Sequence, residues 1–304
     1  MLSTNQLRQV AARTAARDIG NVEIEVLLTY LLQLFHEKSL TAVLAFKGGT
    51  MLRKMVFGAR GRLSTDLDFT SRTDISRDDL LIKILDALAE PYHGIAFRFD
   101  RDKDWYLTDD GCAAVPVCSH AENQNGIKVK LQVSTREQPA LPVKEVPQLR
   151  QDYFSLLPFE PAAIPCLVLE EAIAEKIRAA SQRSKIRDLH DLSEISTRPF
   201  SRDLTRSLAV LKLWNHGGPG LDFERIRQRV KDGRGYDLGE LRNLLRKDQA
   251  PNLKAMTQRV MDGFQFLANF TELEKTLVSD GSWRCRKEAN ELLRLVSETP
   301  NERQ

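Results

Sequence analysis

The N-terminal part of the chain alternates between segments with the apolar spacing of helices and segments with that of strands. Residues 5–38 repeat apolar positions at helical intervals, which predicts helices. The apolar run 42–46 ends at two glycines and predicts a buried strand that enters a turn. A helix with Thr50 near its start is expected over 50–56, and a second strand over 63–69.

The next hundred residues are expected to be mixed as well. Ser76 precedes a helical pattern, and strands are expected over 95–99, 104–108 and 127–133. The third of these strands alternates strictly, with an apolar face of Ile127, Val129, Leu131 and Val133 and a polar face of Lys128, Lys130 and Gln132. The proline-rich stretch 138–165 predicts an extended connector.

From residue 167 the apolar spacing is helical to the end, with glycine-rich breaks at 217–220 and 233–235. We therefore predict an α/β (α+β) domain over residues 1–165, followed by an all-helical domain over residues 166–304. A chain of 304 residues is long enough for two ordinary domains.

The amino-acid composition narrows the class of protein but does not indicate a function. Hydrophobic residues are 42% and charged residues 29% of the chain, which is typical of globular proteins, and the net charge of +3 permits a nucleic-acid partner without requiring one. The four cysteines lack the spacing of a zinc site, which favours ordinary reduced thiols. Because no leader-like or membrane-spanning apolar run is visible, we expect a cytoplasmic protein with no membrane partner.

The strongest chemical pattern is a pair of aspartates on a predicted strand. Asp66 and Asp68 are two residues apart, so their side chains project from the same face. Neighbouring carboxylates repel each other unless a cation lies between them. Such a pair suits Mg²⁺, with Mn²⁺ as the alternative ion, in a site completed by substrate phosphates.

A glycine turn precedes these aspartates. Gly48 and Gly49 would let the backbone approach a phosphate closely at the start of a helix. Further candidates for phosphate contacts are Lys47, Thr50, Arg62 and Ser64. A lone diglycine or a lone pair of spaced aspartates is usually incidental, but their ordered combination favours metal-dependent phosphoryl or nucleotidyl transfer.

Two further motifs lie in the helical half. Lys176 has alanine four residues away on either side, so an acid one turn away is absent, and its ammonium could neutralise phosphate charge or simply be solvated. Asp188 and Asp191 lie one helical turn apart. They could act in catalysis or serve as an acidic first turn that interacts with the helix dipole.

The chain resembles the AbiEii/AbiGii toxin family over about residues 23–192. Four segments carry the resemblance, in the order Phe46–Thr50, Arg62–Asp68, Glu170–Ala179 and Arg187–Leu192. These are nucleotidyltransferase-fold proteins of bacterial toxin–antitoxin and abortive-infection systems. The resemblance implies a polymerase-β-like nucleotidyltransferase core with a small mixed sheet. It also implies that Lys176 contacts nucleotide phosphates and that Asp191 or Asp188 is a later catalytic acid. We favour Asp191, because Asp188 could pair with the adjacent Arg187.

The resemblance further implies a toxin that transfers nucleotides from an NTP to an RNA acceptor, the 3′ end of tRNA, and so blocks translation and growth until a separately encoded antitoxin restrains it. Basic residues between 225 and 247 are compatible with RNA. One departure is Gln132, because relatives often carry an acid on that strand. The alternatives are transfer to a protein or small-molecule hydroxyl, and a catalytically idle module that binds nucleotides or RNA.

Overall fold

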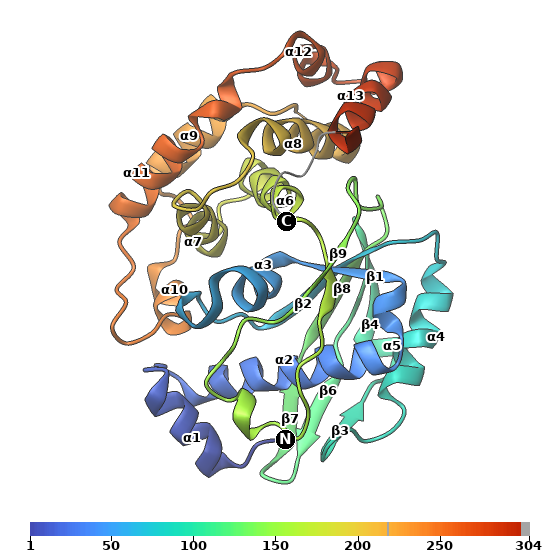
Figure 1. Ribbon diagram of the computed structural model, residues 1–304, viewed down its shortest axis with the longest axis vertical. Helices are drawn as coiled ribbons and strands as arrows, with labels where there is room; N and C mark the ends of the chain where they lie inside the picture. Colours follow the sequence, from blue (N-terminus) through green and yellow to red (C-terminus); the bar gives the residue numbers. More distant parts are fainter. Residues whose placement is uncertain (218, 299–304) are drawn as a thin grey trace. The chain divides into compact units, whose positions relative to one another are not determined.

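The computed structural model describes residues 1–217 and 219–298, so Gly218 in the predicted break at 217–220 lies outside the described residues. The chain divides into two compact units (Figure 1). The first unit comprises Met1–Pro139, Val143–Cys166 and Arg242–Ala250, and the second comprises Ala140–Pro142, Leu167–Leu241 and the chain from Pro251 onward. The predicted domain boundary at 165/166 stays a prediction.

The first unit opens with two helices, as the apolar spacing predicted. α1 spans Thr4–Arg13 and begins with a capping box at Ser3. α2 spans Ile19–Glu37, and the Asp18 side chain caps it by accepting from the Gly20 amide. The apolar stripe of α2 is buried in the core, and it consists of Leu27, Leu28, Leu31, Leu32 and Phe35.

A seven-stranded mixed sheet forms the centre of this unit, in the order β4-β5-β8-β2-β1-β10-β9. The strands are β1 Leu44–Lys47, β2 Asp66–Ser71, β4 Trp105–Thr108, β5 Gly111–Ala114, β8 Lys130–Ser134, β9 Lys144–Val146 and β10 Ile164–Cys166. The pairs β1–β10 and β2–β8 are parallel, and the other neighbours are antiparallel. The mixed sheet confirms the predicted fold class for this half of the chain.

A smaller sheet corrects the prediction of one strand over 127–133. Its strands are β3 Ile95–Arg98, β6 Val117–His120 and β7 Asn123–Lys128. The predicted strand breaks at Val129, whose amide donates to the Pro116 carbonyl at 3.1 Å. Lys128 and Lys130 therefore belong to different sheets. Apolar alternation continues through the break, so the pattern cannot reveal it.

The segment between β1 and β2 is helical, but its start differs from the prediction. α3 spans Gly48–Met51 and continues as a π-helical turn over Leu52–Phe57 and a 3₁₀ turn over Gly58–Arg60. The N-cap residue is Lys47 rather than Thr50, which is fully buried. β2 begins three residues later than predicted, because the Leu63 amide donates to the Leu244 carbonyl at 2.8 Å instead of joining the sheet.

Two further helices complete the first unit. α4 spans Arg77–Leu88, and the Ser76 hydroxyl accepts from the Asp79 amide as its predicted cap. α5 is a single turn over Arg101–Asp104. β5 and β6 were not predicted, because both are four residues long and carry small or polar side chains on either side of Pro116.

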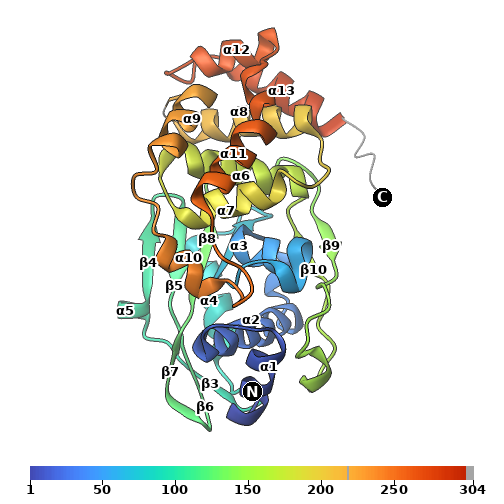
Figure 2. The ribbon, with the colours of Figure 1, turned by 90° about the vertical axis from the view of Figure 1, so that its left-hand side faces the viewer.

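The second unit is helical, as predicted. Its helices are α6 Leu169–Gln182, α7 Ile186–Ile195, α8 Arg202–His216, α9 Phe223–Asp232, α11 Leu253–Gly263, α12 Glu272–Ser279 and α13 Arg286–Glu298. α10 spans Leu238–Leu244, so its residues after Leu241 belong to the first unit. α6 packs against both α7 and α8 (Figure 2). Among the described helices, none combines the length and the apolar character that crossing a membrane requires.

A buried carboxylate joins α12 to α8. Glu274 is fully buried and accepts from the Arg206 Nε at 2.8 Å, from the Ser207 hydroxyl at 2.7 Å and from the Thr271 amide at 2.8 Å. The contact to Thr271 is half of a capping box that begins α12. Glu274 therefore stabilises both the start of α12 and its packing on α8.

We predict that Glu274→Ala lowers the free energy of unfolding by about 3–5 kcal/mol, because the buried Arg206 loses its buried acidic partner and keeps only an ion pair with the exposed Asp203. Glu272→Ala is the matched control, since Glu272 lies in the same helical turn with a side chain that is 90% exposed. That variant is expected to leave the free energy nearly unchanged. Urea unfolding curves of both variants check this, and equal midpoints would contradict the assigned role.

Candidate active site

The two aspartates of the predicted metal pair lie at the start of β2. Asp66 and Asp68 are half-buried, while Leu67 and Phe69 between and beyond them are buried in the core. Asp68 lies opposite Lys47 on β1 and opposite Gln132 on β8. The alternation of β2 thus directs both carboxylates away from the apolar face of the sheet.

Gly48 brings the helix backbone against the Asp68 carboxylate. Its φ is +80°, a conformation that side-chain-bearing residues rarely adopt. A Cβ at this position would lie 2.2 Å from the Asp68 Oδ2 and 2.8 Å from its Cγ. Only glycine therefore fits at the first position of α3, and the diglycine turn lies next to the strand that carries the aspartates.

Gly49 makes a similar approach to the segment that leads into β2. A Cβ here would lie 2.5 Å from the Arg62 Nη2 and 3.4 Å from the Ser64 Oγ. Both of these side chains are buried, and the Arg62 Nη1 donates to the Leu63 carbonyl at 3.2 Å. The first unit thus brings together the predicted residues Gly49, Arg62 and Ser64.

Thr50 has a structural bond that the sequence did not reveal. Its hydroxyl donates to the Asp66 backbone carbonyl at 2.5 Å, and the side chain is fully buried. This bond fastens α3 to the start of β2. The hydroxyl proton is therefore directed to the strand, and the role of Thr50 as a nucleotide contact stays a prediction.

The donor set at β2 fits a divalent cation that also binds substrate oxygens. Over residues 1–217 and 219–298, no three or more His, Cys, Asp or Glu side chains gather in a way that could hold a metal. Asp66 and Asp68 supply two hard carboxylates, and neutral Gln132 occupies the facing position on β8. Mg²⁺ is commonly held by one or two carboxylates together with substrate phosphates, so this pair is sufficient for such a site.

In the helical unit, Lys176 lies between two aspartates. Its Nζ is 3.0 Å from the Asp188 Oδ1 and 2.8 Å from the Asp191 Oδ2. All three side chains are buried. The alternative of a solvated lysine is therefore wrong: its acidic partners come from the next helix, α7, rather than from its own.

Asp188 has a different arginine partner from the one expected. Its Oδ2 accepts from the Arg183 Nε at 2.9 Å, whereas Arg187 pairs with Glu240 at 2.9 Å. Burial by itself raises the pKa of the Asp188 carboxyl, but the neighbouring Lys176 and Arg183 outweigh it and hold the pKa below its usual range. The reason given for favouring Asp191, a pair between Asp188 and Arg187, is therefore wrong.

A second buried ion pair network flanks this cluster on α6. The Lys212 Nζ lies 2.9 Å from the Glu171 Oε1 and 3.0 Å from the Glu175 Oε1. Glu171 also accepts from the backbone amides of Ala140 and Leu141. The sequence analysis missed Lys212, although a lysine at a core-facing position of an amphipathic helix is a signal of a buried pair.

Comparisons with known proteins identify the family of this chain. The model of the family described as "Nucleotidyl transferase AbiEii toxin, Type IV TA system" matches residues 30–270. In fold, the chain is similar to MenT4, a nucleotidyltransferase toxin from Mycobacterium tuberculosis, with a TM-score of 0.80 and 24% identity over 98% of this chain and 100% of that one.

Another similar solved structure is JHP933 from Helicobacter pylori, at 18% identity and a TM-score of 0.48, covering 91% of this chain and 97% of that one. A comparison with curated proteins gives no significant match. The family match spans most of the chain, and it implies nucleotidyl transfer, a nucleotide substrate and an antitoxin partner. The chain therefore belongs to the AbiEii family of nucleotidyltransferase toxins of type IV toxin–antitoxin systems.

Proposed function

We propose that this toxin is a Mg²⁺-dependent enzyme that transfers nucleotides from an NTP to an RNA acceptor, the 3′ end of tRNA. The observation that carries the proposal is the contact between the Gly48 backbone and the Asp68 carboxylate. Nucleotidyl transfer requires a backbone that can approach a phosphate closely and a carboxylate that can hold a cation. The tRNA acceptor and the blocked translation come from the family resemblance.

Each candidate residue has a proposed task toward the nucleotide. Asp66 and Asp68 would hold the divalent cation, which when bound would neutralise phosphate charge and make the α-phosphate more electrophilic. The turn of Lys47, Gly48, Gly49 and Thr50 receives the phosphates, together with Arg62 and Ser64. For Lys176, the family resemblance implies that its ammonium contacts nucleotide phosphates.

The proposed chemistry is an in-line displacement. The 3′ hydroxyl of the acceptor attacks the α-phosphorus, a phosphodiester bond forms, and the bond to the pyrophosphate leaving group breaks. The acceptor hydroxyl loses its proton in this step, and a carboxylate is a suitable general base. We assign that role to Asp191 and a positioning role to Asp188.

The contacts of Asp188 support its positioning role. It binds Lys176 with one oxygen and Arg183 with the other, so its geometry suits a residue that orients Lys176. Asp191 also binds Lys176, with its Oδ2 at 2.8 Å from the Nζ. Its assignment as the base follows the family resemblance, which implies a later catalytic acid in this motif.

We predict that Asp66→Asn and Asp68→Asn each reduce nucleotide transfer on the order of 10²–10³-fold, because each removes half of the charge that holds the cation. The assay incubates the purified protein with each labelled NTP and either total RNA or total protein, with and without EDTA. Label on tRNA that is lost with EDTA supports the proposal.

Three outcomes would contradict it. Label on protein or on a small molecule alone would identify a different acceptor. Absence of label together with undiminished growth arrest by Asp66→Asn would favour an idle binding module. Labelling that persists in EDTA would show that the reaction does not depend on a divalent cation.

We predict that Gly48→Ala lowers kcat/KM roughly a hundred-fold, because the new methyl group displaces the Asp68 carboxylate. Gly20→Ala is the matched control: Gly20 lies in α2, and its added Cβ would be no closer than 3.4 Å to the Asp18 side chain. That variant is expected to retain full activity. Equal activity of the two variants would mean that the close approach at Gly48 has no role in catalysis.

We predict different kinetic defects for the two aspartates of α7. Asp191→Asn is expected to lower kcat on the order of a hundred-fold with KM for the NTP nearly unchanged, because the base is lost. Asp188→Asn is expected to raise KM for the NTP about ten-fold through a displaced Lys176, with kcat nearly unchanged. The reverse pattern in steady-state kinetics would exchange the two assignments.

A further inference from the structure

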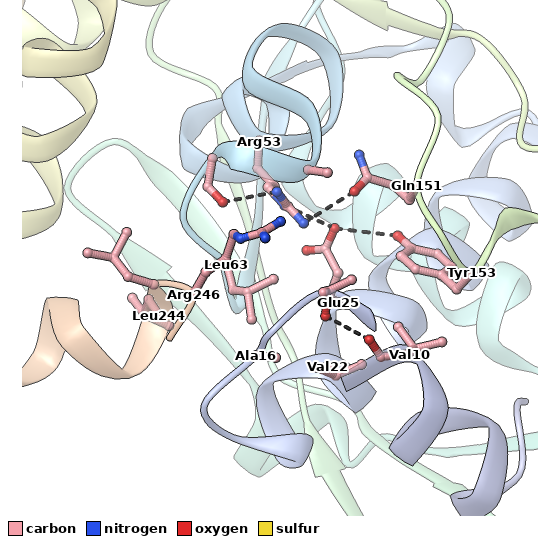
Figure 3. A pocket seen from close by; sticks show the side chains of 14 residues that line it. Val10, Ala16, Val22, Glu25, Arg53, Leu63, Gln151, Tyr153, Leu244 and Arg246 are labelled. Carbon is pink, nitrogen blue, oxygen red and sulfur yellow. Dashed lines mark hydrogen bonds and ion pairs between the residues drawn. The ribbon is translucent and has the colours of Figure 1, made fainter. Parts of the chain in front are cut away.

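A buried charged cluster lies beneath the π-helical turn that follows α3. Glu25, Arg53 and Lys54 are at most 4% exposed, and both cations lie next to the Glu25 carboxylate. Figure 3 shows Glu25 and Arg53. The sequence offered one signal for it, two adjacent basic residues inside an otherwise apolar helix. Burying such charges costs desolvation free energy unless each one has specific partners. The cluster is therefore expected to have a structural or functional role.

Arg53 uses its guanidinium to hold the turn that follows its own helix. Its Nη1 donates to the Gly58 carbonyl and, at 2.9 Å, to the Gly61 carbonyl. Its Nη2 donates to the Gln151 Oε1 at 3.2 Å, and its Nε lies 3.4 Å from the Glu25 Oε1 (Figure 3). The planar fork of arginine suits this arrangement, because it reaches several acceptors in fixed directions.

Lys54 is also buried, but its side chain contacts a different part of the first unit. Its Nζ donates to the Thr29 hydroxyl at 2.8 Å, to the Tyr153 hydroxyl at 3.1 Å and to the Glu25 Oε1 at 3.2 Å. These contacts connect the helix to α2 and to the connector before β10, rather than to the turn at Gly58–Gly61. Lys54 therefore shares with Arg53 its burial, its charge and its contact to Glu25, but it does not share the contacts to the Gly58 and Gly61 carbonyls.

The turn that Arg53 holds leads directly to the nucleotide-binding residues. Gly61 packs so tightly that a Cβ would lie 2.7 Å from the Phe57 Cβ. Two residues later the Leu63 amide donates to the Leu244 carbonyl at 2.8 Å. The backbone of Arg62 is thus anchored on both sides, by Arg53 at Gly61 and by Leu244 at Leu63.

We propose that Arg53 is a positioning residue of the transfer reaction: by holding Gly58 and Gly61, it places the Arg62 guanidinium against Gly49, where the phosphates are received. This inference rests on the proposed function. It assigns no contact between Arg53 and the substrate. It explains why a buried arginine, with its desolvation cost, occurs three residues after Thr50.

The test compares Arg53→Met with Lys54→Met, which removes a charge of equal burial from the same cluster. We predict that both variants lose comparable stability in thermal unfolding, but that only Arg53→Met raises KM for the NTP, by about ten- to a hundred-fold. Arg53→Lys is expected to recover only part of this loss, because an ammonium cannot reproduce the fork that spans two carbonyls. The measurements are KM and kcat from steady-state transfer assays.

A second readout is independent of turnover. Hydrogen exchange of the Arg62 and Leu63 amides is expected to accelerate in Arg53→Met and to stay at the wild-type rate in Lys54→Met. If Arg53→Met does not fold, Gln151→Met replaces it, because it removes one acceptor of the same guanidinium and is expected to give a smaller change in the same direction.

The outcomes separate this inference from the proposed function. Equal KM values and equal exchange rates in the Arg53 and Lys54 variants, in a wild-type protein that transfers nucleotides, would overturn the positioning role alone. A wild-type protein that transfers no nucleotide would overturn the proposed function. In that case the exchange rates still decide whether Arg53 orders the residues before β2.

Discussion

The structure of the first unit depends on the close approach of the Gly48 backbone to the Asp68 carboxylate. This contact requires a residue without a side chain and a positive φ, and it fixes where α3 begins relative to β2. The antiparallel register that places Lys47 opposite Asp68 follows from the same constraint. The bond from Thr50 to the Asp66 carbonyl then fastens the helix and the strand to each other. The turn and the two aspartates are therefore one rigid arrangement.

Paired burial of charge is the second organising constraint, and it operates in each unit separately. In the first unit, Glu25 pairs with Arg53 and Lys54. In the second unit, Lys176 lies between Asp188 and Asp191. Each buried charge has more than one partner, which offsets the cost of removing it from water. Side chains held in this way are oriented before a substrate arrives, and such preorganisation is the main source of electrostatic catalysis.

The chain belongs to the AbiEii family, and the proposed function relates these constraints to nucleotidyl transfer. Under that proposal, neutral Gln132 opposite Asp68 adds no charge to the two carboxylates that would hold the cation. The substrate phosphates would then complete the coordination, which makes cation binding and nucleotide binding interdependent. The TM-score of 0.80 with MenT4 at 24% identity shows that this fold tolerates extensive change of sequence.

The sequence by itself determined the helices, the strand that carries Asp66 and Asp68, and the glycine turn before it, because helical and strand spacing and the conformational freedom of glycine are local properties. Only the tertiary structure decided that residues 127–133 divide between two sheets and that the segment 164–166 is a strand beside β1. It also decided the partners of Lys176 and Arg53. Strand pairing and buried ion pairs join residues far apart along the chain, so no local period of the sequence records them.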